Sequence, residues 1–379
     1  MKKTILLFTV MAYFVTMQTN ATVWRVSNRI INGVTVDADF NTLQDAIDGA
    51  SDSDTLYLMG SKTSYGSGII AKKLTVIGPG YWLAENPNTQ AIKDTAQVTS
   101  LTFNSGSEGS IAQGLYFRVV AATSAYTINY RFITINTDSI TIAKNYFYIY
   151  RYGNYTQGIN EGISIYGDRN YIKIQQNWIQ ILLNDLASGY NGTACSIHFT
   201  GIPINCYIQN NFIYGVSSGP YGEAHNIKTD LTDIANDLKI YNNVIWGNMS
   251  TFYTEQLNNI YVSGTYLGGA DLMMYNLCSD TQYPADAGMF NQQNTDMSTV
   301  FTDYTTMIDN GYALAPGSPA TGAGINGGDC GLFSFDTGGY PYVLSGIPAI
   351  PAIYEATVGP VSGTTIPVTI KASSHNEHK

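Results

Sequence analysis

Apolar and polar residues alternate in short runs along the middle of the chain, and each run ends at an asparagine. Four segments share the order apolar, any residue, Ile, two further residues, Asn, any residue, apolar. These segments are Ile140, Ile142, Asn145 and Phe147; Ile172, Ile174, Asn177 and Ile179; Cys206, Ile208, Asn211 and Ile213; and Leu238, Ile240, Asn243 and Ile245. Their asparagines are 32, 34 and 32 residues apart. Self-similarity at a fixed period indicates a solenoid.

Each unit predicts a strand followed by a turn. The alternation turns one face of the strand inward. The asparagine ends the strand because it tolerates left-handed backbone geometry and bonds local backbone groups. Asparagines on successive coils can also hydrogen bond to one another along the solenoid axis. The period suits a coil of three short strands with one long turn, and we expect stacked parallel strands from about Thr55 to about Phe335.

A helical repeat of similar length is the main alternative for this period. The units are rich in Asn, Tyr and β-branched residues, and they lack the long 3.6-residue apolar periodicity that a helix pair needs. The predicted fold class is therefore all-β.

Further motifs lie on both sides of the repeats. Residues 41–50 predict a short amphipathic helix, with Asn41 and Gln44 as its capping box. The other motifs are Lys73–Gly80, Pro316–Ala320 and Gly328–Gly331. Together with the repeats, these motifs resemble the pectate-lyase-like superfamily over roughly residues 23–335. The resemblance implies a right-handed parallel β-helix solenoid whose open end is plugged by a short N-terminal capping helix, and it does not identify a reaction.

The first 21 residues are a predicted signal peptide. Lys2 and Lys3 precede an apolar run from Ile5 to Val15, and Thr19 and Ala21 are the small residues that signal peptidase needs. This run is too short to span a bilayer, and no later stretch is long enough. We therefore expect a secreted protein, extracellular or at the cell surface, without a membrane span.

The mature chain is predicted to have two parts. Residues 22–335 form the parallel β-helix domain, and residues 336–379 form a Pro- and Gly-rich C-terminal cap or irregular tail. Pro341, Pro348 and Pro351 interrupt regular structure in this tail. Two interpretations remain open, namely an end cap over the last coil and a short attachment or sorting segment.

Composition narrows the range of partners and cofactors. The net charge is −10 and no basic run is present, so nucleic acid is not an expected partner. The four cysteines are Cys195, Cys206, Cys278 and Cys330. They form no CxxC pair and no His/Cys cluster, which favours buried thiols or one disulfide over a metal site. No cofactor is expected, although Asp52 and Asp54 leave a weak calcium site open.

Charged side chains form no recognised catalytic motif. Lyases of the pectate-lyase-like superfamily, which this chain resembles, need acidic calcium ligands and a basic residue, and related hydrolases need paired carboxylates. Their sequence motifs are missing, so no catalytic residue is assigned. Two charged groups lie in predicted long turns two coils apart. The first group is Glu161, Asp168 and Arg169, and the second is Glu223 and His225. They are either solvated turn charges or a cluster on one side of the solenoid, whereas His198, between Ile197 and Phe199, is interpreted as structural.

Outward positions after each asparagine form two predicted columns that are rich in aromatic residues. The first column is Tyr146, Trp178, Phe212 and Val244, and the second is Tyr148, Gln180, Tyr214 and Trp246. Such columns either bind sugar rings or pack beneath the chain's own loops. The candidate ligand-binding residues are Tyr148, Trp178, Tyr214 and Trp246.

Three functions remain open. The first is a noncatalytic β-helix protein that binds carbohydrate or another surface polymer. The second is a polysaccharide lyase or glycoside hydrolase, and the third is a purely structural surface protein. Scarce charge and the missing motifs favour the first and the third over the second.

Overall fold

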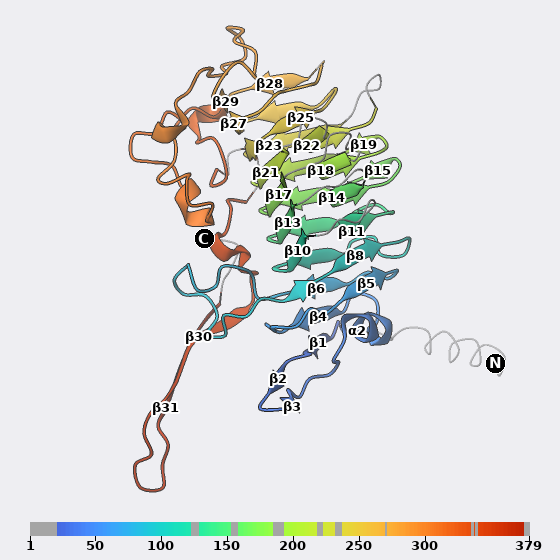
Figure 1. Cartoon of the computed structure of the whole chain (residues 1–379), viewed down its shortest axis with the longest axis vertical. Helices are drawn as coiled ribbons and strands as arrows, with labels where there is room; N and C mark the ends of the chain where they lie inside the picture. The colour runs from blue at the N-terminus through green and yellow to red at the C-terminus, as the bar shows by residue number, and fades with distance from the viewer. Residues whose placement is uncertain are drawn as a thin grey trace, which may run out of the picture.

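The computed structural model describes residues 21–374 apart from 123–128, 153–157, 185–192, 218–222, 232–236, 270, 335–336 and 338–339. The chain forms an all-β parallel solenoid, as predicted (Figure 1). Within these described residues, the parallel strands form three long sheets of ten, eight and seven strands. Residues 111–135 show one coil, in which the chain passes through the ten-, eight- and seven-stranded sheets in that order.

The ten-stranded sheet contains β1 (Val23–Val26), β4 (Thr55–Leu58), β6 (Thr75–Ile77), β9 (Ile111–Gln113), β12 (Thr141–Ala143), β16 (Lys173–Gln175), β20 (Cys206–Gln209), β23 (Leu238–Tyr241), β26 (Glu255–Leu257) and β28 (Leu272–Met274). The eight-stranded sheet contains β7 (Gln97–Val98), β10 (Tyr116–Ala122), β13 (Tyr146–Tyr152), β17 (Trp178–Asn184), β21 (Phe212–Ser217), β24 (Val244–Trp246), β27 (Ile260–Ser263) and β29 (Leu277–Cys278). The seven-stranded sheet contains β5 (Ser67–Ile70), β8 (Ser100–Phe103), β11 (Tyr130–Ile135), β14 (Ile159–Ile165), β18 (Thr193–Phe199), β22 (Glu223–Thr229) and β25 (Asn248–Ser250).

Short elements complete the chain. Two small pairings are β2 (Ile30–Ile31) with β3 (Val34–Thr35) and β15 (Arg169–Asn170) with β19 (Pro203–Ile204). The 3-10 helices are η1 (Met297–Thr299), η2 (Asp309–Tyr312), η3 (Ile325–Gly327) and η4 (Leu344–Gly346).

The predicted N-terminal helix is α2 (Leu43–Gly49), which buries Leu43, Ala46 and Ile47 against the first coils. Its predicted capping box is wrong. Thr42 is the N-cap, and its hydroxyl accepts a hydrogen bond from the Asp45 N–H at 3.2 Å. The side chain of Gln44 instead accepts from the Ile69 N–H, which ties the helix to β5.

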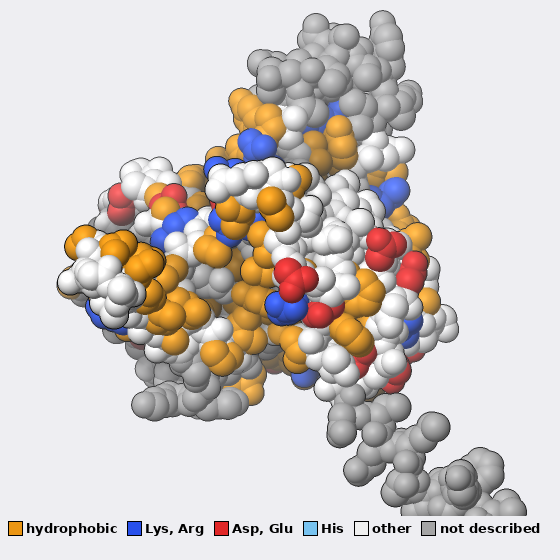
Figure 2. Space-filling model, turned by 90° about the horizontal axis from the view of Figure 1, so that it is seen from below, with side chains coloured by type: hydrophobic (Ala, Val, Ile, Leu, Met, Phe, Trp, Pro, Cys, Tyr) orange, Lys and Arg blue, Asp and Glu red, His pale blue; other side chains and the backbone are white. Residues whose placement is uncertain are grey.

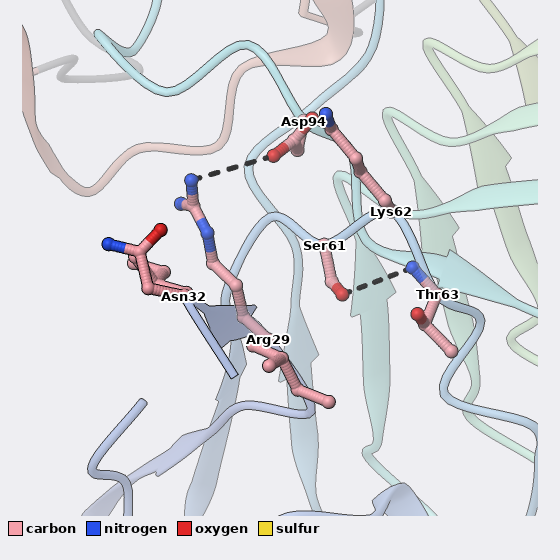
Figure 3. A pocket seen from close by; sticks show the side chains of 8 residues that line it. Arg29, Asn32, Ser61, Lys62, Thr63 and Asp94 are labelled. Carbon is pink, nitrogen blue, oxygen red and sulfur yellow. Dashed lines mark hydrogen bonds and ion pairs between the residues drawn. The ribbon is translucent and has the colours of Figure 1, made fainter. Parts of the chain in front are cut away.

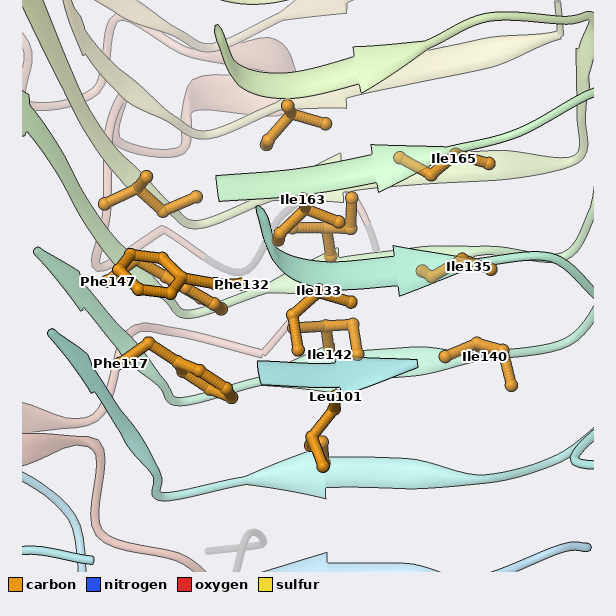
Figure 4. Packing of buried hydrophobic residues seen from close by; sticks show 14 of the residues in the cluster. Leu101, Phe117, Phe132, Ile133, Ile135, Ile140, Ile142, Phe147, Ile163 and Ile165 are labelled. Atoms are coloured by element: carbon orange, nitrogen blue, oxygen red, sulfur yellow. The ribbon is translucent and has the colours of Figure 1, made fainter. Parts of the chain in front are cut away.

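Columns of identical apolar residues fill the interior. Ile142, Ile174 and Ile208 lie in register on neighbouring strands, and all three are fully buried. Phe117 and Phe147 stack with ring centroids 4.8 Å apart (Figure 4). Burying one such side chain contributes roughly 2 kcal/mol, so repetition along the axis gives each coil its own share of the core.

A ladder of buried asparagines joins the coils. The four predicted members are Asn145, Asn177, Asn211 and Asn243. The N–H and the Nδ2 of Asn177 both donate to the Oδ1 of Asn211, at 2.9 and 3.0 Å, and the other steps repeat this pattern. The prediction of one inward-pointing column is therefore confirmed. The ladder also continues through Asn259, Asn276 and Asn291 at spacings of 16, 17 and 15 residues.

The left-handed residue of each turn is the one before the ladder asparagine. Lys144, Gln176, Asn210 and Asn242 have φ between 54° and 57°. The expectation that the ladder asparagine itself adopts this geometry is wrong. All four residues are buried, and the side-chain amides of Gln176, Asn210 and Asn242 bind a segment from elsewhere in the chain.

That segment is residues 297–347, here called the covering segment. Parallel strands end at Cys278 and not near Phe335, and the covering segment then folds back along the eight-stranded sheet (Figure 1). Asn210 Nδ2 donates to the Leu332 carbonyl at 2.8 Å, and Gln176 Nε2 donates to the Tyr340 carbonyl at 3.0 Å. The covering segment therefore binds along the column of left-handed turn residues.

From Ser345 onward, the C-terminal tail lies against the early coils. The Tyr81 N–H donates to the Ser345 carbonyl, and the Ala91 N–H donates to the Ile353 carbonyl. From there β30 (Pro351–Val358) and β31 (Val368–Ser374) form an antiparallel hairpin that projects beyond the first coils (Figure 1). Viewed from this end, hydrophobic side chains gather over much of the surface with scattered charges between them (Figure 2).

Three further expectations concern export and the cysteines. The predicted signal peptide lies almost wholly outside the described residues. In the described part of the chain, no helix has the length and apolar character that crossing a membrane requires. Cys195, Cys206, Cys278 and Cys330 are buried free thiols.

Candidate functional site

The first outward column is covered by the chain itself. Trp178 is 0% exposed, and its ring stacks on Phe212 with centroids 3.7 Å apart. Tyr312 of the covering segment lies against both rings, at 4.5 Å from Phe212 and 5.4 Å from Trp178. The prediction that Trp178 is an exposed binding residue is therefore wrong, because a segment more than 100 residues later in the chain packs over it.

The second column stays partly open and forms the floor of a groove of about 650 Å³, here called the aromatic groove. Its lining residues are Trp82, Tyr116, Arg118, Tyr146, Tyr148, Gln180, Leu182, Tyr214, Thr306, Met307 and Ile308. Tyr148 and Tyr214 are half-buried, so each presents part of its ring to solvent. Two of the four predicted binding residues therefore line this groove.

Trp246, the fourth predicted residue, lies at the end of the groove. Its ring meets Tyr214 edge-on at 5.2 Å and lies 6.1 Å from Tyr304 of the covering segment. Trp246 is half-buried and closes the column without lining the groove.

Two polar side chains supply hydrogen-bond donors in the groove. Gln180 is 5% exposed, and its Oε1 accepts from the Tyr146 hydroxyl at 2.6 Å. This bond orients the amide and leaves its NH₂ group without a partner among the described residues. Arg118 is exposed and has no ion pair within the described part of the chain. Sequence inspection missed Arg118, although it occupies the Tyr148 position one coil earlier.

The tyrosine hydroxyls of the groove remain neutral at physiological pH. Burial raises the pKa of Tyr116 to about 12 and also raises the pKa of Tyr148 and of Tyr214. Each hydroxyl can therefore both donate and accept a hydrogen bond.

A separate group of charges lies on the outer face of the seven-stranded sheet. This ion-pair cluster consists of Arg131, Glu161, Ser164, His198, Lys228 and Asp230. His198 bonds Glu161 through Nδ1 at 2.8 Å and Asp230 through Nε2 at 2.9 Å. Glu161 lies on β14, so its predicted place in a long turn is wrong. The structural interpretation of His198 has a specific basis here, since its ring joins two carboxylates on different coils.

The pKa shifts in the cluster favour the charged forms of Glu161, His198 and Asp230. Burial alone would raise the pKa of Glu161, but hydrogen bonds from His198, Ser164 and Arg131 hold it below its usual value. Burial alone would lower the pKa of His198, yet Glu161 and Asp230 raise it. Both ring nitrogens of His198 are bonded, and the Glu161 carboxylate accepts three hydrogen bonds, so both groups are held by partners within the protein.

The remaining predicted charged residues are Asp168, Arg169, His225 and Glu223. Asp168 accepts a hydrogen bond from the Ile202 N–H at 2.8 Å, and Arg169 bonds the Asp168 carbonyl, so both stabilise a turn. His225 lies on β22 and is buried, in the column position that Glu161 occupies two coils earlier. The Glu223 side chain lies outside the described residues.

A smaller cavity of about 340 Å³ lies beside the β2–β3 hairpin (Figure 3). Arg29 and Asp94 approach each other there at 3.7 Å, and Lys62 lines the same cavity. It offers no aromatic surface, so the aromatic groove is the stronger candidate site.

The carboxylates of Asp52 and Asp54 accept hydrogen bonds from other groups of the protein. Asp54 accepts hydrogen bonds from the Thr22 N–H, the Trp24 indole and the Ser51 N–H, and Asp52 accepts from the Lys73 N–H. Among the described residues, no group of three or more His, Cys, Asp or Glu side chains is arranged to hold a metal ion.

No family model matches this sequence, and comparison with curated proteins gives no significant match.

Proposed function

We propose that this protein is a secreted, noncatalytic parallel β-helix of the pectate-lyase-like superfamily that binds carbohydrate in its aromatic groove. The observation that carries the proposal is the groove itself, where Tyr148 and Tyr214 offer ring surface beside the N–H donors of Gln180 and Arg118. Sugar rings have apolar faces and hydroxyl-bearing edges, which suit a concave site that combines aromatic rings with a few placed polar groups.

The ion-pair cluster supports a noncatalytic function over a lyase or hydrolase. Its carboxylates are held by His198, Arg131 and Lys228, and the pKa values of Glu161 and Asp230 are lowered. A general acid for glycoside cleavage needs a raised pKa and a free approach to the substrate. The cluster fits a role in joining coils.

A glycan-binding screen tests the proposal. The Tyr148→Ala/Tyr214→Ala double variant should bind at least tenfold more weakly than the wild type, because two rings contribute roughly 1 kcal/mol each. Tyr171→Ala is the matched control, since Tyr171 is 57% exposed and lies outside the groove. Equal loss in the control, or no binding by the wild type, would contradict glycan binding in the groove. Release of shortened or unsaturated sugars by the wild type would favour the enzyme alternative.

A further inference from the structure

The floor of the aromatic groove has a period of two coils. The strand register aligns Arg118, Tyr148, Gln180 and Tyr214 in one column on β10, β13, β17 and β21. Along the solenoid axis the order is therefore donor, ring, donor, ring. Neighbouring strands lie about 4.8 Å apart, so the two rings are roughly 10 Å apart, and the two donors repeat at the same interval.

The walls direct a ligand along this column. Trp82 lies 4.9 Å from Tyr146 and 4.9 Å from Trp178, on one side of the floor. Met307 and Ile308 of the covering segment continue the same side. A ligand that crosses the sheet would meet this wall, whereas a chain parallel to the axis follows the open floor.

The groove also has a defined length. Its lining begins at the Arg118 coil and ends at Tyr214, beyond which Trp246 lies in the column with its ring 6.1 Å from Tyr304. Three steps between coils give roughly 14 Å, which is room for about three sugar units.

From these features we infer that the groove takes a linear, extended glycan with diequatorial 1,4-linkages, lying parallel to the solenoid axis. This inference rests on the proposed carbohydrate-binding function. In such a ribbon, successive units are turned by about half a revolution, so every second unit presents the same face, a period that matches the two-coil spacing of the rings. One unit stacks on Tyr148, the next is held at its edge by the Gln180 amide, and the third stacks on Tyr214. Chains with axial linkages curve into helices and leave the second ring uncovered.

The test compares β-1,4-linked and α-1,4-linked oligomers of glucose, from two to five units, in calorimetric titrations of the full mature protein. The β-linked trimer should bind at least tenfold more tightly than the α-linked trimer. Affinity should rise from dimer to trimer and change little beyond it. Gln180→Leu should weaken the β-linked trimer about tenfold, and thermal melting of each variant checks that the fold is retained.

The possible failures are distinguishable. Equal affinity for the two linkages, abolished by the Tyr148→Ala/Tyr214→Ala variant, would overturn the extended-chain inference and leave glycan binding in the groove intact. A β-linkage preference that survives the double variant would place binding elsewhere and overturn both proposals. If neither series binds, the inference fails, and the broader glycan screen then decides on the proposed function.

Discussion

Replacing Asn211 by alanine tests the asparagine ladder at its centre. Asn211 is fully buried, and its Nδ2 donates to the carbonyls of Ile174 and Gln209 and to Asn243 Oδ1 at 2.8–3.0 Å. Its Oδ1 accepts from both the N–H and the Nδ2 of Asn177. Alanine removes all five bonds.

The expected cost follows from which groups lose every partner. Asn177 Nδ2 keeps its bond to the Ile142 carbonyl, and Asn243 Oδ1 keeps the Asn211 N–H, so these groups stay satisfied. The buried Asn177 N–H loses the acceptor that Asn211 provides. An unsatisfied buried donor costs about 1–3 kcal/mol and each other lost bond somewhat less, so the free energy of unfolding should fall by roughly 3–5 kcal/mol.

Urea unfolding followed by circular dichroism measures this change. Asn310→Ala is the matched control, because Asn310 is exposed, and the substitution should change stability by less than about 0.5 kcal/mol. If Asn211→Ala loses less than about 1 kcal/mol relative to this control, the ladder does not stabilise the stack in the way its geometry implies.

Three other expectations concern pH and the core. The folded-state pKa of His198 is raised, so its ion pairs stabilise the fold fully below pH about 6.5 and lose effect as pH rises through the folded value. Urea midpoints should fall over this range in the wild type and stay flat in His198→Gln; parallel profiles would contradict the role of the imidazolium. Burial raises the pKa of Asp271 to about 6, so its contribution is greatest below pH about 3.9 and is lost as pH rises through 6. Asp271→Asn should therefore be more stable than the wild type at pH 7, and an unchanged melting temperature would refute this. Ile208→Asp should prevent folding, because it buries an unpaired charge. Lys173→Asp changes an exposed position, so this variant should melt near the wild-type temperature. Equal melting temperatures of the two variants would mean that the inward and outward positions are assigned the wrong way round.

Local sequence patterns predicted the coil correctly, because the alternation of apolar and polar residues determines which side chains of a strand point inward. The spacing of Asn145, Asn177, Asn211 and Asn243 located the ladder, and the alternation around Ile174 identified the inward face correctly. Asn259 and the later ladder members were missed because their coils are half as long. These coils also lack the isoleucine of the motif, because Gln256, Met273 and Gly288 stand three residues before Asn259, Asn276 and Asn291.

Local sequence patterns could not predict that the covering segment packs over the outer face of the eight-stranded sheet. Trp178 does project from the outer face of its strand, as predicted, but its burial depends on Tyr312 and its neighbours in the covering segment. No periodicity relates these two regions. Glu161 was predicted to lie in a long turn, yet it lies on β14, a strand whose outer face carries the ion-pair cluster.

The change in ladder spacing from 32 or 34 residues to 15–17 shows that one step of the stack needs only about half of a long coil. The remaining residues of each long coil are inserted at positions away from the asparagine turn, where they do not alter the rise from one coil to the next. The fold can therefore gain or lose loop residues by insertion and deletion, while the stacked strands and the asparagine ladder stay the same. Related chains should differ mainly in the lengths of these insertions, and a shortened version of this protein would be made by trimming within coils while keeping every ladder asparagine.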